Sequence, residues 1–536
     1  MTQSHPSRRS RIAVAGTAGG VLALAGSVVT ALPAAAGGGN GCENRNNNTV
    51  AKLTECVTLE GVTEHLEAFQ EIADDNEGNR ASGTPGYEAS VEYVEQRLQA
   101  AGYESTRQSF EFPFFQLRSS SFSRVTPAPA TYSAADFTPM TYTAAGTVDD
   151  GVVTPVDLPA TGLGSGCETG DFTGFAAGTV ALVQRGGCAF AVKAQNAQLA
   201  GASAVIVFNN TAGPLAGTLG APGTRIPVIG VSTALGQELA APGTTVDLAV
   251  DSTSETRTTY NVVAELPGRT SDNVVMAGAH LDSVLAGPGI NDNGSGSAAI
   301  LEVAENMAEV KPVNTVRFAW WGAEELGLLG SEHYVSQLSD AQVADIGLYL
   351  NFDMVGSPNF ARFIYDGDQS DFTAPVAVPE GSDQIEYVLE DYFEAQGLWY
   401  EGSEFSGRSD YQAFIEAEIP SGGLFTGAEV LKQEYQVPLY GGLAGVAYDR
   451  NYHQAGDTIG NVDPKALETN SDAIAYSVLT LSYDTSRVNG AQGRPVPGGT
   501  FQGDPTDRQF RVTPEQKAGG GGLSPDHDHD HGGEEI

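Results

Sequence analysis

Hydrophobic and polar positions change their periodicity along the chain. Between residues 57 and 108, apolar side chains recur at helical spacing, as at Val91, Val94 and Leu98, and Gly102 is a favourable helix stop. The predicted helices are 63–76 and 87–101, with a loop at 80–86 between them.

The stretch from 120 to 255 is rich in Gly, Ala, Thr and Pro and contains short β-branched runs. Such runs between turn residues predict a small, separate β/α unit. The expected strands are 179–184, 204–209, 226–231 and 245–250, with a helix at 189–200.

From residue 260 onward, apolar strands alternate with helical patterns. Strands that alternate with helices favour a mostly parallel α/β sheet. The expected strands are 261–266, 274–280, 315–321 and 346–352, and the expected helices are 297–308 and 331–338.

The N-terminus has the pattern of an export signal. Arg8, Arg9 and Arg11 precede an apolar stretch over 12–32, and alanines at 34–36 fit a cleavage site after Ala36. We therefore expect a secreted, extracellular protein; the Sec and twin-arginine routes both remain open. No later stretch reaches 18 consecutive apolar residues, so we expect no membrane span.

Cysteine usage agrees with export. The four cysteines form two pairs that are local in sequence, Cys42 with Cys56 and Cys167 with Cys188, and none has the CxxC spacing of a metal site. In an oxidising compartment we expect these two disulfides, although other connectivities remain open. A thiol nucleophile is the less favoured reading.

The charge balance narrows the range of partners. The chain has 27 Lys and Arg against 67 Asp and Glu, a net charge of -40. Because phosphate groups bind basic surfaces, this balance argues against nucleic acid and against an anionic membrane. Its ordinary interpretation is a solvated, self-repelling surface.

Polar residues gather where the predicted strands end. Each has an ordinary reading as a loop residue, a turn or a helix cap, but their recurrence at successive strand ends favours one site. The residues are His280 and Asp282, Asp292 in GINDNGSG, Glu324 and Glu325, Asp353, and His453 much further along.

These residues offer only nitrogen and oxygen donors. Such a set suits zinc, or less readily cobalt or manganese. There are more candidate ligands than the three that one catalytic zinc takes from protein, so two metals sharing one carboxylate fit better. One glutamate of the adjacent pair is then free to act as a general base.

The motifs resemble those of the M28 family of di-zinc aminopeptidases of the secreted bacterial type. The resemblance rests on HLDS (280–283), GINDNGSG (289–296), WGAEELGLLGS (321–331), NFDMVG (351–356), YHQAGDT (452–458) and RASGTPGY (80–87). Residues 130–250, with GTVALVQRGGCAF and IPVIGVS, resemble a protease-associated (PA) domain. The implied fold is a mixed, mostly parallel twisted sheet flanked by helices, with a small β-rich PA domain inserted.

The resemblance also implies a domain organisation. We expect a signal peptide at 1–36, a peptidase domain formed by 37–129 and 251–485, a PA-like insert at 130–250, and a flexible tail at 486–536. The insert is expected to lie over or beside the mouth of the active site and to be dispensable for the chemistry.

Residue by residue, the resemblance implies two zinc ions. His280 and Asp353 would hold one, Glu325 and His453 the other, and Asp292 would bridge both through its carboxylate. In this family the peptide bond after the bridging aspartate, here Asp292–Asn293, is often cis. The bridging water would give its proton to Glu324, the general base, which would pass it to the leaving amine.

Three further roles follow from the same resemblance. Asp282 would orient His280, and Tyr452 would stabilise the oxyanion. Arg408, in GRSDY, resembles a substrate-binding arginine; its alternative is a surface arginine paired with an acid. Some members flank the last histidine motif with two cysteines, where this chain has Asn451 and Gly456.

The expected function is hydrolysis of the N-terminal peptide bond of peptides and proteins by a monomer. An M28-like carboxypeptidase is the alternative within the fold. It must bind a free carboxylate, usually with clustered arginines, whereas this chain is poor in basic residues, which favours recognition of an amine. A glutaminyl cyclase is less favoured, because those enzymes hold a single zinc. A non-catalytic binding protein on the same fold would require missing ligands, yet all five are present.

The chain ends in an alternating Asp and His tract at 526–531. Such tracts bind metal in some proteins, and the ordinary reading is a solvated acidic end. Both interpretations remain open.

Overall fold

The computed structural model describes residues 41–42, 45–160, 162, 164–501, 508–513 and 516–517. The expected signal peptide and the Asp and His tract lie outside the described residues. Within the described residues, no helix has both the length and the apolar character to cross a membrane.

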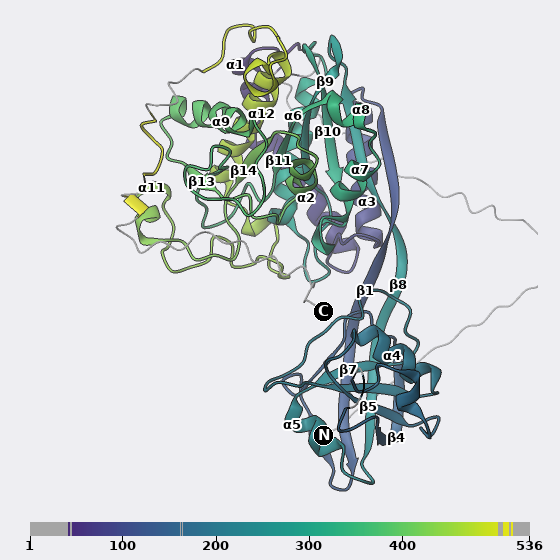
Figure 1. Ribbon diagram of the computed structural model, residues 1–536. Helices are drawn as coiled ribbons and strands as arrows, with labels where there is room; N and C mark the ends of the chain where they lie inside the picture. Colours follow the sequence, from purple (N-terminus) through teal and green to yellow (C-terminus); the bar gives the residue numbers. More distant parts are fainter. Residues whose placement is uncertain are drawn as a thin grey trace, which may run out of the picture. The chain divides into compact units, whose positions relative to one another are not determined.

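The peptidase-like part is a twisted sheet between two layers of helices (Figure 1). Strands β9, β10, β11 and β14 run parallel, β8 is antiparallel to β10, and β12 is antiparallel to β14 and parallel to β13. The strand order is β13-β12-β14-β11-β9-β10-β8, and the sheet is mixed and mostly parallel at its centre, as predicted. Its strands are β8 (Thr245–Leu266), β9 (Thr270–His280), β10 (Asn314–Trp321), β11 (Ile346–Phe352), β12 (Phe363–Tyr365), β13 (Glu401–Ser403) and β14 (Ser421–Phe425).

The helices of this part include all those predicted, with ends that differ by a few residues. They are α1 (Val50–Cys56), α2 (Leu59–Asp75), α3 (Pro85–Ala100), α6 (Gly296–Met307), α7 (Leu329–Ser336), α8 (Asp340–Asp345), α9 (Ser382–Gln396), α10 (Tyr411–Glu416), α11 (Val437–Tyr440), α12 (Pro464–Tyr483) and α13 (Ser486–Asn489). Thr49, Thr58, Thr84, Ser339 and Asp463 cap the N-termini of α1, α2, α3, α8 and α12 with their side chains.

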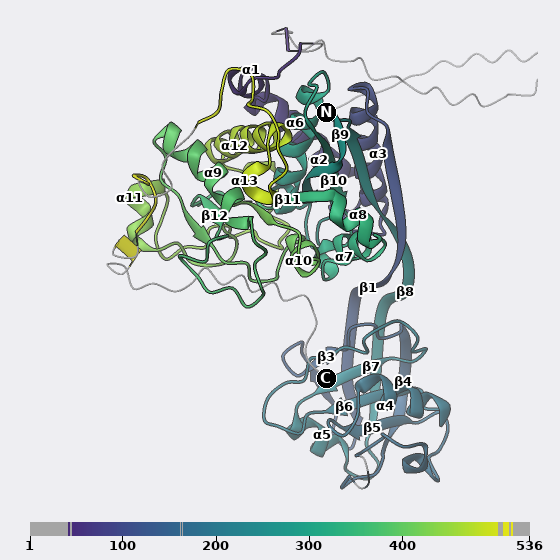
Figure 2. The same ribbon diagram turned by 45° about the horizontal axis from the view of Figure 1, so that its top comes forward.

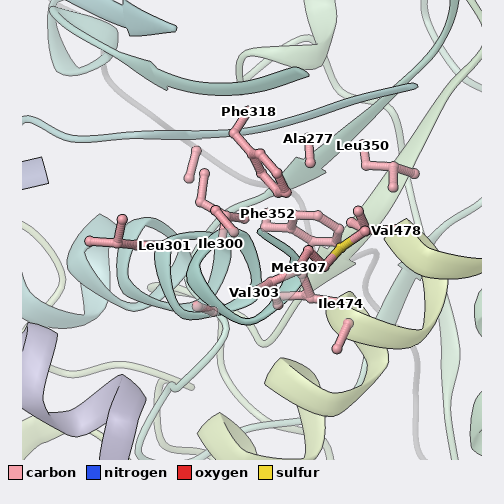
Figure 3. Packing of buried hydrophobic residues seen from close by; sticks show 14 of the residues in the cluster. Ala277, Ile300, Leu301, Val303, Met307, Phe318, Leu350, Phe352, Ile474 and Val478 are labelled. Carbon is pink, nitrogen blue, oxygen red and sulfur yellow. The ribbon is translucent and has the colours of Figure 1, made fainter. Parts of the chain in front are cut away.

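Alternation along the central strands decides which helices cover each face. In β9, Val275, Ala277 and Ala279 face the core that includes α2, α3, α6, α9 and α12, whereas Val274 and Met276 face the core that includes α7 and α10. Figure 3 shows the first core, where Ala277, Phe318, Leu350 and Phe352 of the strands meet α6 and α12. Both faces are buried, which explains the near-continuous apolar runs of the sequence.

The PA-like part has its own cores. Strands β4, β5, β6 and β7 are parallel neighbours, β3 closes one edge and β4 pairs with β8 at the other. Two hydrophobic cores draw only on residues between 122 and 250. The elements are β2 (Ala130–Tyr132), β3 (Phe137–Pro139), β4 (Gly146–Pro155), β5 (Val180–Gln184), α4 (Phe190–Leu199), β6 (Ala204–Phe208), β7 (Val228–Val231) and α5 (Thr233–Leu239).

A long antiparallel ribbon connects the two parts of the chain. Strand β1 (Ser105–Thr126) pairs with β8 from Ser105 opposite Ala264 to Thr126 opposite Thr245 (Figures 1 and 2). The sequence did not predict this ribbon, and the domain boundary expected at 250/251 falls inside β8. Both expected disulfides, Cys42–Cys56 and Cys167–Cys188, are present.

The segment after α12 is packed against the rest of the protein over many residues that were predicted to be flexible. Val488, Val496 and Val512 are buried, so the residues from 486 to 501 and from 508 to 513 are not a flexible tail. The amide of Val512 donates to the carbonyl of Tyr400, and the amide of Tyr400 donates to the carbonyl of Phe510, which extends the sheet beside β13. Glycine and proline richness predicted flexibility here, but three buried valines outweigh it.

The register of the ribbon predicts where the chain can be shortened without unfolding the peptidase-like part. Removal of residues 116–253, with an Asn-Gly turn joining Phe115 to Ser254, should close β1 and β8 as a hairpin, because these two residues are opposite each other. The peptidase-like cores contain no residue from the removed segment, so the product should be soluble and unfold cooperatively in a thermal melt followed by circular dichroism.

A matched control shifts the register by one residue. If the same Asn-Gly turn joins Phe115 to Glu255, the side chains of β8 point toward the opposite face of the sheet. This variant should therefore be less stable. If both shortened chains fail to fold, the segment between 116 and 253 is integral to the peptidase-like part.

Candidate active site

His280 is the last residue of β9, and its ring is completely surrounded by protein. Its Nδ1 lies 3.1 Å from the main-chain oxygen of Asp282 and 3.7 Å from the Asp282 carboxylate. Its Nε2 faces Asp292 and Asp353, each with a carboxylate oxygen 3.4 Å away. Contacts on Nδ1 leave Nε2 as the atom directed at the acidic side chains.

Asp292 lies between two histidines. It belongs to the irregular turn η2 (Ile290–Ser295), and its bond to Asn293 is cis, as the resemblance implied. One carboxylate oxygen is 3.4 Å from Nε2 of His280, and the other is 3.3 Å from Nε2 of His453. The same carboxylate therefore belongs to two ligand groups.

The two groups have the composition of a pair of metal sites. His280, Asp292 and Asp353 offer ligand atoms within 4.8 Å of one another, as do Asp292, Glu325 and His453. Glu325 approaches His453 to 2.9 Å. The five residues come from positions as distant as 280 and 453, yet the structure brings all of them together.

Several of these atoms have no hydrogen-bond partner within the described part of the chain. They include Nε2 of His280, one oxygen each of Asp292 and Asp353, and Oε1 of Glu325, whose other oxygen faces His453. Buried polar atoms without partners are costly, so the arrangement fits bound cations that would supply the missing contacts. The imidazole and carboxylate donors are those that zinc accepts.

The charges of the site shift its pKa values strongly. Burial acts to lower the pKa of His453, but the charges of Glu325 and Asp292 raise it to about 11. Burial raises the pKa of Glu325 to about 7, and the charge of Asp292 acts in the same direction. Metal must displace the proton from His453, so metal affinity should increase with pH.

Glu324 is a buried carboxyl group next to these ligands. Its side chain is fully buried, and one of its oxygens lies 3.8 Å from Nε2 of His280. Its amide donates to Oδ1 of Asp282, whereas neither of its own carboxylate oxygens has a hydrogen-bond partner among the described residues. Burial raises the pKa of Glu324 well above its usual range, with Asp410 and Asp353 acting in the same direction. Such a group can receive and hold a proton.

The positions of Tyr452 and Arg408 bear differently on the roles that were predicted for them. The Tyr452 ring stacks on His453 with centroids 3.8 Å apart, and burial raises its pKa well above the usual range, so its hydroxyl remains a donor. Arg408 directs Nη2 toward Glu429, at 3.7 Å. An acid partner agrees with the alternative interpretation of Arg408, and its substrate-binding role stays a prediction.

A chain of hydrogen bonds behind Asp353 was not predicted from the sequence. Ser409 donates to Oδ2 of Asp353 at 2.7 Å and accepts from the side-chain amide of Asn351 at 2.8 Å. Tyr349 donates to Asn351, and Trp321 donates to Tyr349. Ser409 lies in the GRSDY motif, but no local pattern indicates a contact with Asp353.

Asp410, the next residue, was also missed. Its carboxyl is buried, and neither oxygen has a hydrogen-bond partner in the described ranges. Burial raises its pKa to about 7, and the charges of Asp353 and Asp282 add to the effect. It is therefore a second buried carboxyl group, besides Glu324, whose ionised form the site disfavours.

The described residues contain two other acidic groups, and cations of the chain itself contact both. Glu305 beside His65 is held by Arg97 at 2.6 Å. Asp366, Asp368 and Glu386 form the second group, and Arg511 lies 3.5 Å from Glu386. Neither resembles the active-site pair, where no arginine approaches the ligands within ion-pair distance in the described sequence.

Known proteins are similar to this chain over most of its length. Residues 261–478 match Peptidase family M28, and residues 152–239 match the PA domain. An aminopeptidase of Pseudomonas aeruginosa is 49% identical over 455 residues, which cover 82% of this chain and 84% of that protein. Leucine aminopeptidase 2 of Trichophyton tonsurans is 44% identical, over 83% of this chain and 88% of its own length.

Solved structures show the same fold. The aminopeptidase from Aneurinibacillus sp. strain AM-1 aligns with a TM-score of 0.56 and 25% identity, over 87% of this chain and all of that one. A zinc aminopeptidase from Bacillus subtilis aligns with a TM-score of 0.52 and 24% identity, over 78% of this chain and 94% of that one. With relatives this similar over most of their length, the chain belongs to peptidase family M28 and carries a PA domain.

Proposed function

We propose that this protein is a zinc-dependent aminopeptidase that removes N-terminal residues from peptides and proteins. The observation that carries the proposal is the Asp292 carboxylate, which belongs to a buried ligand group and to a second, partly exposed one, beside the buried carboxyl of Glu324. The names of the similar proteins from Pseudomonas aeruginosa and Trichophyton tonsurans support the same activity.

Two zinc ions would be held by five side chains. His280 and Asp353 would bind one, Glu325 and His453 the other, and Asp292 both. When bound, zinc supplies a Lewis acid that activates water and polarises the scissile carbonyl. The unsatisfied ligand atoms and the absence of cysteine from the donor set support this assignment.

Glu324 would act as the general base. Its burial and its two unpaired oxygens suit a carboxylate that takes a proton from the attacking water and delivers it to the leaving amine. The bond from its amide to Asp282 fixes the main chain at this position. Tyr452 would donate its hydroxyl to the oxygen on which negative charge develops.

An M28-like carboxypeptidase remains the alternative, and its test concerns the end of the substrate that is recognised. It would need a cation to receive the C-terminal carboxylate. Arg408, the candidate singled out from the sequence, already faces Glu429. The acidic surroundings favour a substrate ammonium group instead.

We also propose that the enzyme acts as a monomer outside the cell, with the PA domain as an accessory part. The two disulfides support an oxidising compartment. The division into a peptidase domain and a PA insert is supported by separate hydrophobic cores, and the PA-like cores extend to Phe122, outside the insert expected at 130–250.

Blocking the free amine of the substrate should abolish hydrolysis. We expect leucyl-p-nitroanilide to be cleaved and its N-acetyl derivative to be left intact, because the carboxylates of the site would bind the ammonium group. Release of amino acids from an unblocked peptide, followed by mass spectrometry, should begin at the N-terminus. Trimming from the C-terminus alone would establish the carboxypeptidase instead.

Glu324→Gln should retain the fold and zinc but lose activity. The substitution preserves the shape of the side chain and removes its ability to accept a proton, which typically costs 10²–10⁴-fold in rate. Turnover of the anilide should be measured beside zinc content by mass spectrometry. Activity within tenfold of the unmodified enzyme would rule out Glu324 as the base.

Removal of ligands should lower zinc content in a graded way. The unmodified protein should hold two zinc ions, Asp353→Ala about one and Asp292→Ala close to none, because only Asp292 belongs to both groups. Asp340→Ala, at an exposed acid, is the control and should retain both ions. Two ions retained by Asp292→Ala would contradict the bridging role.

A further inference from the structure

The loop that carries Asp292 lies between two buried ionisable side chains, Arg80 and Asp457. Residues 288–292 run in the narrow space after β9, and Gly289 has φ 61°. A Cβ at Gly289 would come within 2.4 Å of the carbonyl oxygen of Asp292. The main-chain groups of this loop are buried, so each needs a partner from elsewhere in the protein.

Arg80 satisfies the carbonyl groups on one side. It is fully buried, and it donates from Nε to the carbonyl of Pro288 at 2.9 Å and from Nη2 to that of Gly289 at 2.6 Å. Its Nη1 donates to the carbonyl of Leu281, the residue after His280. One guanidinium thus connects the His280 loop to the Asp292 loop. Among the described residues it forms no ion pair, and its three side-chain bonds all go to main-chain carbonyls.

Asp457 satisfies the amides on the other side. Its Oδ1 accepts from the amide of Asn291 at 2.9 Å, and its Oδ2 accepts from the amide of Asp292 at 3.0 Å. Its main-chain oxygen accepts from the amide of Ile290 at 3.1 Å. Asp457 is 2% exposed, and it follows His453 by four residues, so it also connects the Asp292 loop to the second histidine.

Together, the two residues satisfy one polar main-chain group of every residue from 288 to 292. The arrangement links the positions of His280, Asp292 and His453, although neither Arg80 nor Asp457 belongs to the ligand groups. These bonds satisfy buried main-chain groups that would otherwise be left unpaired at a cost, and they are present without metal. The loop is therefore held from both sides, independently of the ligands.

We propose that Arg80 and Asp457 are positioning residues that hold Asp292 in its bridging position before metal binds. The proposal rests on the proposed two-zinc function, and it adds that the ligand geometry comes from these main-chain contacts. Without them, part of the binding free energy of the metal would be spent on ordering the loop. Loss of such supporting contacts typically costs 10–100-fold in metal affinity.

The first test compares variants that leave all five ligands intact. Arg80→Lys keeps the charge, but its donors lie on a single nitrogen and cannot reach the three carbonyls that Nε, Nη1 and Nη2 bind. Asp457→Asn keeps the shape but leaves one amide without an acceptor. Each should weaken zinc binding by at least about tenfold, measured by competition with a chromophoric chelator at a temperature well below unfolding. The turnover number at saturating zinc should also fall. Arg97→Lys, which alters an arginine bound to Glu305, is the control and should retain the zinc affinity of the unmodified protein.

The second test needs no variant. In the zinc-free protein, hydrogen exchange followed by mass spectrometry should find the amides of 290–292 already protected, to nearly the same degree as with zinc. Fast exchange that slows only when zinc is added would overturn the proposal. This measurement also decides the case if a substituted protein fails to fold.

The results separate this proposal from the proposed function. If the unmodified protein binds fewer than two zinc ions, the two-metal function is wrong. If it binds two, but the variants lower only the melting temperature of the zinc-free protein and leave zinc affinity unchanged, Arg80 and Asp457 are merely structural. Lower affinity in both variants, with the Arg97 control unchanged, supports the positioning role.

Discussion

The concentration of negative charge away from water is the constraint on which this structure depends. Four carboxyl groups, Asp292, Glu324, Asp353 and Asp410, are buried at the same end of the sheet, with Glu325 beside them. Burial raises the pKa values of Glu324, Asp410 and Glu325, with neighbouring carboxylates acting in the same direction, and among the described residues two histidines face this group of acids. Bound cations would offset the cost of burying these carboxyl groups, so the fold itself favours metal binding at this end of the sheet.

The sheet makes this concentration of charge possible. Strands β9, β10 and β11 are buried on both faces, and their carboxyl ends place His280, Glu324 and Asp353 side by side. Because the strands are anchored by apolar packing, the polar residues need not contribute to the stability of the fold. The site can therefore retain unpaired groups that would be unfavourable elsewhere.

The sequence predicted the sheet, and it predicted which polar side chains gather at the ends of its strands, because both have local signals. Apolar runs marked the central strands, and a histidine or acid directly after each run marked the site. It did not predict the β1 and β8 ribbon, whose alternation is weakened by exposed serines and threonines. Nor could it reveal the contacts of Arg80 or Ser409, since their partners lie 201 to 209 and 56 residues away along the chain. Composition was misleading after α12, where a few buried valines override many glycines.

The packing of residues 508–513 has a consequence for how the protein is made. This segment bonds to Tyr400 beside β13, and Arg508 and Arg511 bring positive charge to the buried Glu390. Synthesis proceeds from the N-terminus, so the sheet edge and this acid lack their partners until at least 513 residues have been translated. The catalytic domain therefore completes its folding only after synthesis of that segment, even though its first helices, α1 to α3, are made early.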